Sequence, residues 1–279
     1  MSMNRAGNLG ALKPDEVAGL IIEPALSASI FAQAANQISF NSANLRIPRV
    51  ADGSAAWTSE GAEIGVSDAT ISEVVAPAKA IKALTFLSNE LVADGNPNTL
   101  ELIGNAAARQ IAAELDKAAF ANTTTNGPVG VESVAGLAYD ENTDLTNLDD
   151  IQLAVAAIQS NGYNPSVLVT TPEIYAELSI LKTGTGSNVP LLQTDATQGV
   201  GRNANGLTVL VSAKVTPGTL YVWDTTQVIL GVRQDAELVV SDDAAFSSDR
   251  KAIRAVARFA VAFPAPKAVA RLSAPVGSV

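Results

Sequence analysis

The chain has 279 residues, of which 47% are hydrophobic, and a formal net charge of −10 from 28 acidic and 18 basic side chains. This length and apolar content favour a folded protein of one large domain or two modest ones. The chain has no Cys and no His, which excludes disulfides, thiolate sites and every catalytic arrangement built on those residues. A strongly acidic chain is also a poor binder of DNA phosphates.

No segment resembles a signal peptide, because the short apolar stretch at residues 9–12 is followed at once by Lys13-Pro14-Asp15-Glu16. No apolar run approaches the roughly 20 residues that a membrane-spanning helix needs. We therefore expect a protein that is made and stays soluble in a cytoplasm, without contact to a membrane.

Residues 45–85 are expected to form a long β-hairpin. Leu45 and Ile47 alternate with polar neighbours, and the return strand is expected to run from about Ile71 to Leu84. Such a hairpin has few apolar partners of its own, so we do not expect it to be stable alone in water.

The far part of this hairpin is acidic, with five acidic residues and no Lys or Arg between Val50 and Ala78. The acids are Asp52, Glu60, Glu63, Asp68 and Glu73. Trp57 sits in an otherwise small and polar tip. Trp57 has two interpretations: an anchor on the surface of a partner, and local packing across the hairpin.

Residues 98–120 carry the clearest helical pattern. Asn98 is followed three residues later by Glu101, which is the pattern of a capping box. The apolar stripe at helical spacing consists of Leu100, Ile103, Ala107, Ile111, Leu115 and Ala118.

The next part of the chain is expected to alternate helices, strands and loops. The expected elements are a helix from 148 to about 161, a buried strand at 166–170, a helix from Pro172 to about Lys182, an exposed loop at 183–206, and strands at 207–212 and 220–223.

The strongest β pattern lies near the C-terminus. One face of this strand carries Ile253, Ala255, Ala257, Phe259, Val261 and Phe263, and the other carries Arg254, Val256 and Arg258. From Arg250 to Arg271 there are six basic residues and no acid. Exposed aromatic residues, which single-stranded nucleic acid stacks on, are not interleaved with these cations. The pattern therefore favours salt bridges over DNA binding as the role of these cations.

The sequence predicts no catalytic, cofactor or metal site. The glycine patterns at 184–186 and 199–201 lack the Lys and the strand–turn–helix context of a phosphate-binding loop. The pairs Asp149-Asp150 and Asp242-Asp243 are adjacent in sequence, so their side chains point in different directions and converge poorly on one ion. We interpret them as solvated or helix-capping acids.

The order of these elements resembles that of the tailed-phage major capsid proteins, whose shared architecture is the Hong Kong-type phage capsid fold. The resemblance covers nearly the whole chain, and the order and spacing of its motifs carry it. The motifs are Leu84-Thr85-Phe86-Leu87-Ser88-Asn89-Glu90-Leu91 with Asp94, the helix 106–120 with Glu114-Leu115-Asp116, Val189-Pro190-Leu191-Leu192, Gly206-Leu207-Thr208-Val209, Tyr221-Val222-Trp223-Asp224, and 258–264.

The resemblance implies an α+β fold divided into an N-terminal arm, an extended loop, and a peripheral and an axial domain. The implied bounds are 1–44 for the arm, 45–85 for the extended loop, 86–145 with 235–279 for the peripheral domain, including the spine helix, and 146–234 for the axial domain. It also implies a non-enzymatic major capsid protein whose copies form pentamers and hexamers of an icosahedral shell in the virion. That shell would be assembled in the host cytoplasm and would enclose double-stranded DNA without binding it specifically.

Two departures from the family pattern affect the expected partners. Numbering starts at Met1, which leaves no room for a long N-terminal scaffolding segment before the arm, so a scaffold would come from a separate protein or from none. No Lys lies between Val50 and Ala78, so we expect no isopeptide crosslink from the extended loop. A cement protein and a portal are the other possible partners.

The charges suggest how neighbouring copies fit together. We expect Glu60, Glu63 or Asp68 of the acidic loop to face Arg250, Arg254 or Arg258 across a subunit boundary, with Trp57 as a further contact. An encapsulin-like bacterial compartment, which the family resemblance would also allow, is the alternative function. A carboxylate-based enzyme and a secreted surface-layer protein are more distant alternatives.

Overall fold

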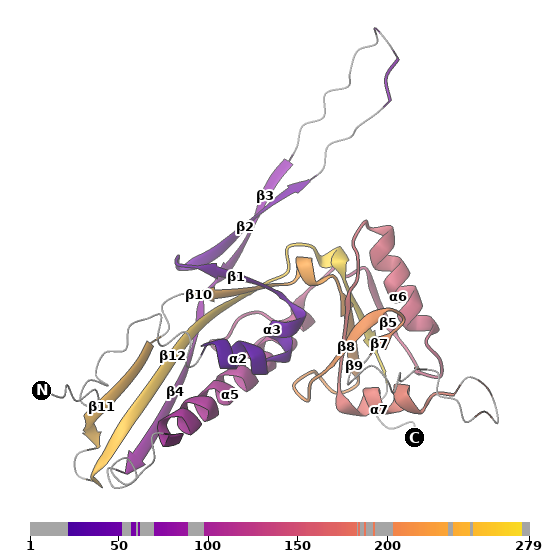
Figure 1. The fold of residues 1–279 in the computed structure, drawn as a ribbon. Helices are drawn as coiled ribbons and strands as arrows, with labels where there is room; N and C mark the ends of the chain where they lie inside the picture. Colours follow the sequence, from indigo (N-terminus) through magenta and orange to yellow (C-terminus); the bar gives the residue numbers. More distant parts are fainter. Residues whose placement is uncertain are drawn as a thin grey trace, which may run out of the picture.

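The computed structural model describes residues 22–51, 57–59, 61, 70–88, 98–182, 184, 187, 192, 203–233, 237–245 and 248–274. Within these ranges the chain forms three β-sheets with helices against two of them (Figure 1). The elements in chain order are α2 (Glu23–Ala28), α3 (Ile30–Ala34), β1 (Asn36–Phe40), β2 (Asn44–Ala51), β3 (Thr70–Pro77), β4 (Lys79–Ser88), α5 (Asn98–Phe120), the 3₁₀ turn η3 (Val131–Ser133), β5 (Tyr139–Asn142), α6 (Asp149–Ser160), β6 (Val167–Thr170), α7 (Pro172–Ile180), β7 (Asn203–Ala204), β8 (Leu207–Val211), β9 (Thr219–Trp223), η4 (Thr225–Gln227), β10 (Ile229–Arg233), β11 (Glu237–Ala245), β12 (Arg250–Ala262), η6 (Pro266–Ala268) and β13 (Val269–Ser273).

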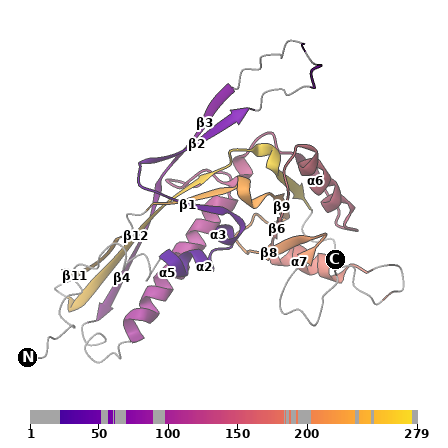
Figure 2. The ribbon, with the colours of Figure 1, turned by 45° about the horizontal axis from the view of Figure 1, so that its top comes forward.

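The first sheet is built around β12, which pairs antiparallel with β10, β11 and β4, while β1 pairs in parallel with β10. Helix α5 lies along one face of this sheet in both views (Figures 1 and 2). The alternation predicted for the C-terminal strand is confirmed on this face, because Ala255, Ala257, Phe259 and Val261 are buried in the core that also contains the helix residues Ile111 and Leu115.

The second sheet has the strand order β5-β13-β9-β6-β8-β7. Alternate residues of its central strands point into two different cores, so these strands are buried throughout. Val169 and Trp223 belong to the core shared with α5, whereas Leu168 and Val222 pack with α6 and α7. The long helix, the two shorter helices, the buried strand at 166–170 and the strands at 207–212 and 220–223 were all predicted and are confirmed within one or two residues.

Local sequence signals set the ends of the shorter elements. Thr171 caps α7, where its side chain accepts a hydrogen bond from the Ile174 amide at 3.3 Å, and Pro172 follows at the first turn, where its missing N–H costs nothing. Gly162 ends α6 and Gly218 closes the β8–β9 turn, both with positive φ, a backbone conformation that glycine adopts without strain.

Three aromatic rings join the N-terminal helices, the end of α5 and the second sheet. The ring centroids of Phe31 and Phe120 lie 5.5 Å apart, and those of Trp223 lie 6.3 Å and 6.4 Å from them. The indole Nε1–H of Trp223 donates to the carbonyl oxygen of Ala34 at 2.8 Å. All three rings are fully buried, so this cluster holds the two sheets in one body.

A buried carboxylate fixes the same N-terminal helices to α5. Asp116, which is 5% exposed, accepts hydrogen bonds from the Ser29 hydroxyl at 2.5 Å and from the amides of Ile30 and Phe31, both at 3.0 Å. It thereby satisfies amides at the start of α3 that have no partner within that helix. Burial raises the pKa of Asp116, against the opposing effect of these donors and of the Lys214 charge.

The hairpin differs from the prediction in its return strand. The single strand expected from 71 to 84 is divided into two strands, β3 and β4, which meet at Ala78. The amide of Ala78 donates a hydrogen bond to the other side of the hairpin, to the Ala43 carbonyl at 3.0 Å. Beyond that point β4 pairs with β12 from Lys79↔Phe259 to Ser88↔Arg250. The hairpin therefore ends at Pro77, and residues 79–88 form part of the first sheet.

Two other segments pair with strands that are distant in the sequence. Residues 22–40, expected in the arm, are held by their own chain, since α3 lies in the main core and β1 pairs with β10. Strands β5 and β13, expected with the peripheral parts, pair with each other, and β13 also pairs with β9, so both belong to the second sheet. The partner residues are far apart in sequence, which no local pattern reveals.

Replacing Phe120 with Ala should lower the free energy of unfolding of the unassembled subunit by about 3–5 kcal/mol, the usual cost of emptying a buried aromatic site. The matched control is Phe86→Ala on β4. Phe86 is 47% exposed, so its loss should change stability by no more than about 0.5 kcal/mol. Urea denaturation measures both, and equal losses would contradict the assignment of Phe120 to the joining cluster.

Asp116 should make stability depend on pH. Because burial raises its folded pKa above the unfolded value of about 3.9, the stability that this carboxyl contributes is complete below about pH 4 and is lost as pH rises through the folded pKa. Since Asn does not titrate, the unfolding free energy of wild type should fall relative to that of Asp116→Asn above about pH 4, by at most about 1.4 kcal/mol per pH unit. A difference between the two proteins that stays constant from pH 4 to 8 would contradict this.

Candidate subunit interface

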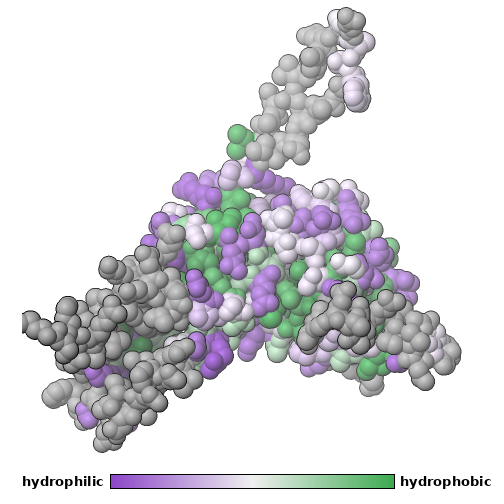
Figure 3. Space-filling view, in the orientation of Figure 1, coloured by the Kyte–Doolittle hydropathy of each residue, from purple (hydrophilic) through white to green (hydrophobic). Residues whose placement is uncertain are grey.

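The hairpin formed by β2 and β3 stands clear of the rest of the molecule (Figures 1 and 3). Its strands pair antiparallel from Asn44↔Pro77 to Ala51↔Thr70. Its root is buried, since Leu45 and Ala76 are 7% and 5% exposed. A two-stranded ribbon cannot bury its own faces, so beyond the root its side chains meet solvent or another molecule.

The two faces of the hairpin differ in chemistry. Ile47 and Val74 continue the root towards Arg49 and Ser72, so this face becomes polar along its length. The opposite face carries Ile71 and Val75, which are 74% and 49% exposed. Between these two lies Glu73, whose carboxylate is 3.5 Å from the guanidinium of Arg46. Large apolar side chains of the described residues are thus exposed on this face of the hairpin.

The predicted contact residues of the hairpin tip lie beyond these strands. Trp57 is fully exposed, at 105%, so its side chain has no packing partner among the described residues. Glu60, Glu63 and Asp68 lie outside the described residues, and their positions stay predictions.

The face of the first sheet opposite α5 carries the predicted basic residues. The register pairs Leu84 with Arg254, Phe86 with Ala252, Ala80 with Arg258 and Ser88 with Arg250, and directly paired residues share one face of a sheet. We call the surface made by Leu84, Phe86, Arg250, Arg254 and Arg258 the outer sheet face. Leu84 and Phe86 are 59% and 47% exposed, Arg250 and Arg254 are exposed and Arg258 is half-buried. Arg254 and Arg258 also interact within the chain.

Sequence reasoning missed Leu84 and Phe86, although a signal was present. Residues 80–87 alternate Ile81, Ala83 and Thr85 with Lys82, Leu84 and Phe86, so both faces of the strand contain apolar side chains. The first set packs towards α5 and the second is exposed in the isolated chain. A strand with apolar side chains on both faces is typical of a sheet whose two faces are both packed against other elements or molecules.

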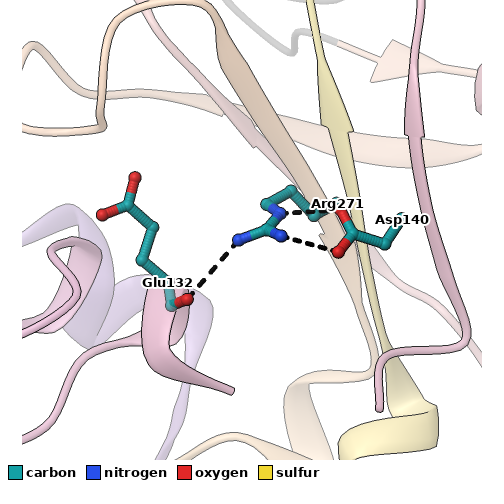
Figure 4. A network of polar contacts seen from close by, with 3 residues as sticks. All are labelled: Glu132, Asp140 and Arg271. Carbon is teal, nitrogen blue, oxygen red and sulfur yellow. Dashed lines mark hydrogen bonds and ion pairs between the residues drawn. The ribbon is translucent and has the colours of Figure 1, made fainter. Parts of the chain in front are cut away.

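Arg271, the last cation of the basic run, has a different role from the arginines of the outer sheet face. Its guanidinium donates to both carboxylate oxygens of Asp140, at 2.8 Å and 2.6 Å, and to the Glu132 carbonyl at 3.4 Å (Figure 4). The hydrogen bond to Asp140 raises the pKa of Arg271. Arg271 therefore attaches the edge strand β5 and the turn η3 to β13.

Further polar groups of the described residues lie in a cleft next to α7. A cleft of about 430 Å³ is lined by Asp144, Leu145, Thr146, Glu177, Ile180, Leu181 and Lys182. Its Asp144 accepts hydrogen bonds from the amide and hydroxyl of Thr146, which lower the pKa of this carboxyl. Among the described residues there is no cluster of three or more possible metal ligands, and none of their helices has the length and apolarity to cross a membrane.

Comparison with solved structures identifies the same overall architecture in phage particles. The chain is similar to a protein of Mycobacterium phage Bobi, with a TM-score of 0.70, 22% identity and coverage of 100% of this chain and 96% of that one. It is also similar to a chain of the capsid of a native GTA particle, with a TM-score of 0.72, 15% identity and coverage of 98% and 95%. At these identities the likeness establishes the fold, which is the predicted Hong Kong-type phage capsid fold.

The family comparison extends this result to the role of the chain. Comparison with curated proteins finds no match, but the model of the phage capsid family matches residues 10–274. The encapsulin-like alternative is not favoured by these matches. The chain therefore belongs to the phage capsid family and is a major capsid protein, a structural subunit of an icosahedral virion shell.

Proposed function

We propose that copies of this chain form pentamers and hexamers in which the hairpin of each copy lies on the outer sheet face of a neighbouring copy. The observation that carries the proposal is that large apolar side chains are exposed on both surfaces, Ile71 and Val75 on the hairpin and Leu84 and Phe86 on β4. Burying one such side chain fully is worth about 1.5–3 kcal/mol. A contact between two copies would cover both surfaces at once.

The proposed contact also brings opposite charges together. Glu60, Glu63 and Asp68 of the hairpin would meet Arg250, Arg254 and Arg258. Single exposed ion pairs contribute only about 0–1 kcal/mol, so we assign these pairs to register and orientation, which charge complementarity controls more than it controls affinity. Trp57 would anchor the tip of the hairpin in the same contact.

The first sheet with α5 would form the peripheral part of each pentamer or hexamer, and the second sheet with α6 and α7 the axial part. The shell, assembled in the host cytoplasm, would confine double-stranded DNA without specific binding, which suits a chain of net charge −10. A portal, a separate scaffold and a cement protein are its proposed partners. The proposed role is structural, which the match to the phage capsid family supports.

A photo-crosslinking side chain at position 57 tests the hairpin contact directly. Shells are assembled from an equal mixture of isotopically light and heavy subunits, irradiated and digested. The expected crosslink joins position 57 to a peptide from residues 79–88 or 250–262, with mixed light–heavy pairs that identify two different copies. Crosslinks confined to one copy would overturn the proposal.

Reversing charge with Glu60→Lys and Glu63→Lys together should impair assembly while leaving the unassembled subunit folded, because both acids would then repel the arginines of the outer sheet face. Sedimentation measures the fraction of protein in shells. Adding Arg250→Glu and Arg254→Glu should recover part of that fraction. Normal assembly of the Glu60→Lys, Glu63→Lys protein would eliminate the charge pairing.

Replacing Trp57 with Ala separates the two interpretations of this residue. An anchor on a neighbour predicts an unchanged melting temperature of the unassembled subunit, because Trp57 is fully exposed there, together with a reduced yield of shells. A drop in melting temperature with normal shell yield would instead indicate packing across the hairpin.

A further inference from the structure

The hairpin is attached to the body through a small apolar cluster of its own. The buried members are Leu45 and Ala76 from the hairpin, Ile229 from β10, and Ala260 and Ala262 from β12, with Ile38, Phe40, Ile47 and Val74 packed against them. This cluster, which we call the hairpin seat, is separate from the two larger cores. Figure 3 shows hydrophobic residues where the hairpin leaves the body.

Gly231 of β10 lies beneath this seat. It is paired with Ile38 on one side and with Ala260 on the other. A Cβ atom built on Gly231 would lie 2.8 Å from Cδ2 of Leu45, 2.9 Å from Cε1 of Phe40 and 3.3 Å from Cβ of Ala260. The first two distances are shorter than carbon atoms approach without contact strain, so a side chain at position 231 must displace the ends of the Leu45 and Phe40 side chains.

The backbone does not explain this glycine. Gly231 is absent from the residues with positive φ, and it keeps regular register with both neighbouring strands. A glycine within a strand weakens the strand, and where it occurs it often marks a close approach of another segment. Here the approaching atoms belong to the side chains of Leu45, at the root of the hairpin, and of Phe40 at the end of β1.

A shift at the seat is amplified along the hairpin. Leu45 is the second residue of β2, and the six residues that follow it in this strand extend for about 20 Å at the usual rise of a β-strand. Arg46, Pro48 and Arg49 are already exposed, so none of the described residues packs over the hairpin at these three positions. Its direction is therefore set at the root.

We propose that Gly231 is a positioning residue that sets the angle at which the hairpin leaves the body, and through it the curvature at which neighbouring copies meet. The inference rests on the proposed contact of the hairpin with a neighbour. Filling position 231 tilts the hairpin, and the tip then meets the outer sheet face of the next copy in a different place.

The angle can be measured on the unassembled subunit. The chain has no Cys, so Ser72→Cys on the hairpin and Gln159→Cys on α6 accept spin labels at two defined, exposed positions. Double electron–electron resonance should give a distance distribution that shifts in Gly231→Ala. Adding Leu45→Val, which removes the atom nearest to the new methyl group, should return the distribution towards that of wild type.

A control on the same strand separates angle from stability. Val232 faces the main core instead of the seat, so Val232→Ala should lower the melting temperature without shifting the distance. Electron microscopy then counts the shells of wild-type diameter. Their number should be at least tenfold lower for Gly231→Ala than for wild type, and unchanged for Val232→Ala. Leu45→Val alone, which loosens the seat without overfilling it, should broaden both the distances and the diameters.

Several outcomes would overturn the inference: an unshifted distance in Gly231→Ala, an equal shift in Val232→Ala, or shells of wild-type diameter from Gly231→Ala. If Gly231→Ala fails to fold, unchanged spin-label distances in Leu45→Val would refute the claim that the hairpin seat sets the direction of the hairpin. The crosslink from position 57 keeps the two ideas apart. Suppose that the crosslink joins two copies of the wild-type protein, but that the spin-label distances do not shift in Gly231→Ala. The hairpin contact is then supported, and only the proposed role of Gly231 is refuted.

Discussion

The contact among Phe31, Phe120 and Trp223 makes one body of parts that would otherwise be separate. Each ring comes from a different element, namely α3, the end of α5 and β9. The core that surrounds them includes one face of each large sheet, so the sheets cannot shift relative to each other without opening it. A projecting hairpin needs such a body, because a ribbon anchored on a deformable base would not point in one direction.

The strand β4 connects this body to the surface that we assign to assembly. Only Ala78 separates it from β3 of the hairpin, and its face away from α5 carries Leu84 and Phe86. In the proposed shell, the hairpin of one copy therefore contacts β4 of its neighbour, and this strand directly continues the neighbour's own hairpin. The contacts around a pentamer or hexamer would then be linked through a single continuous segment in each copy.

Elements with a strong local pattern could be predicted from the sequence, whereas pairings between distant segments could not. The apolar stripe from Leu100 to Ala118 predicts α5, and the alternation of β12 predicts that its arginines share one face. The pairing of β4 with β12 spans more than half of the chain and leaves no local signal. The residues of the outer sheet face, our proposed contact site, were partly predictable. Alternation places Arg250, Arg254 and Arg258 on one face, but the exposure of Leu84 depends on which face α5 covers.

The chemistry available to the proposed interface makes it reversible, contact by contact. Without Cys, and without a Lys between residues 50 and 78, this part of the hairpin contributes neither a disulfide nor a Lys side chain for an isopeptide bond. What remains are a few apolar side chains and exposed ion pairs, each worth at most a few kcal/mol. A misplaced copy bound through so few contacts can dissociate, since affinity is adjusted mostly through the dissociation rate. The stability of a closed shell then comes from the number of such contacts. The direction of the hairpin, which is set at its root, therefore matters more than the strength of any single ion pair.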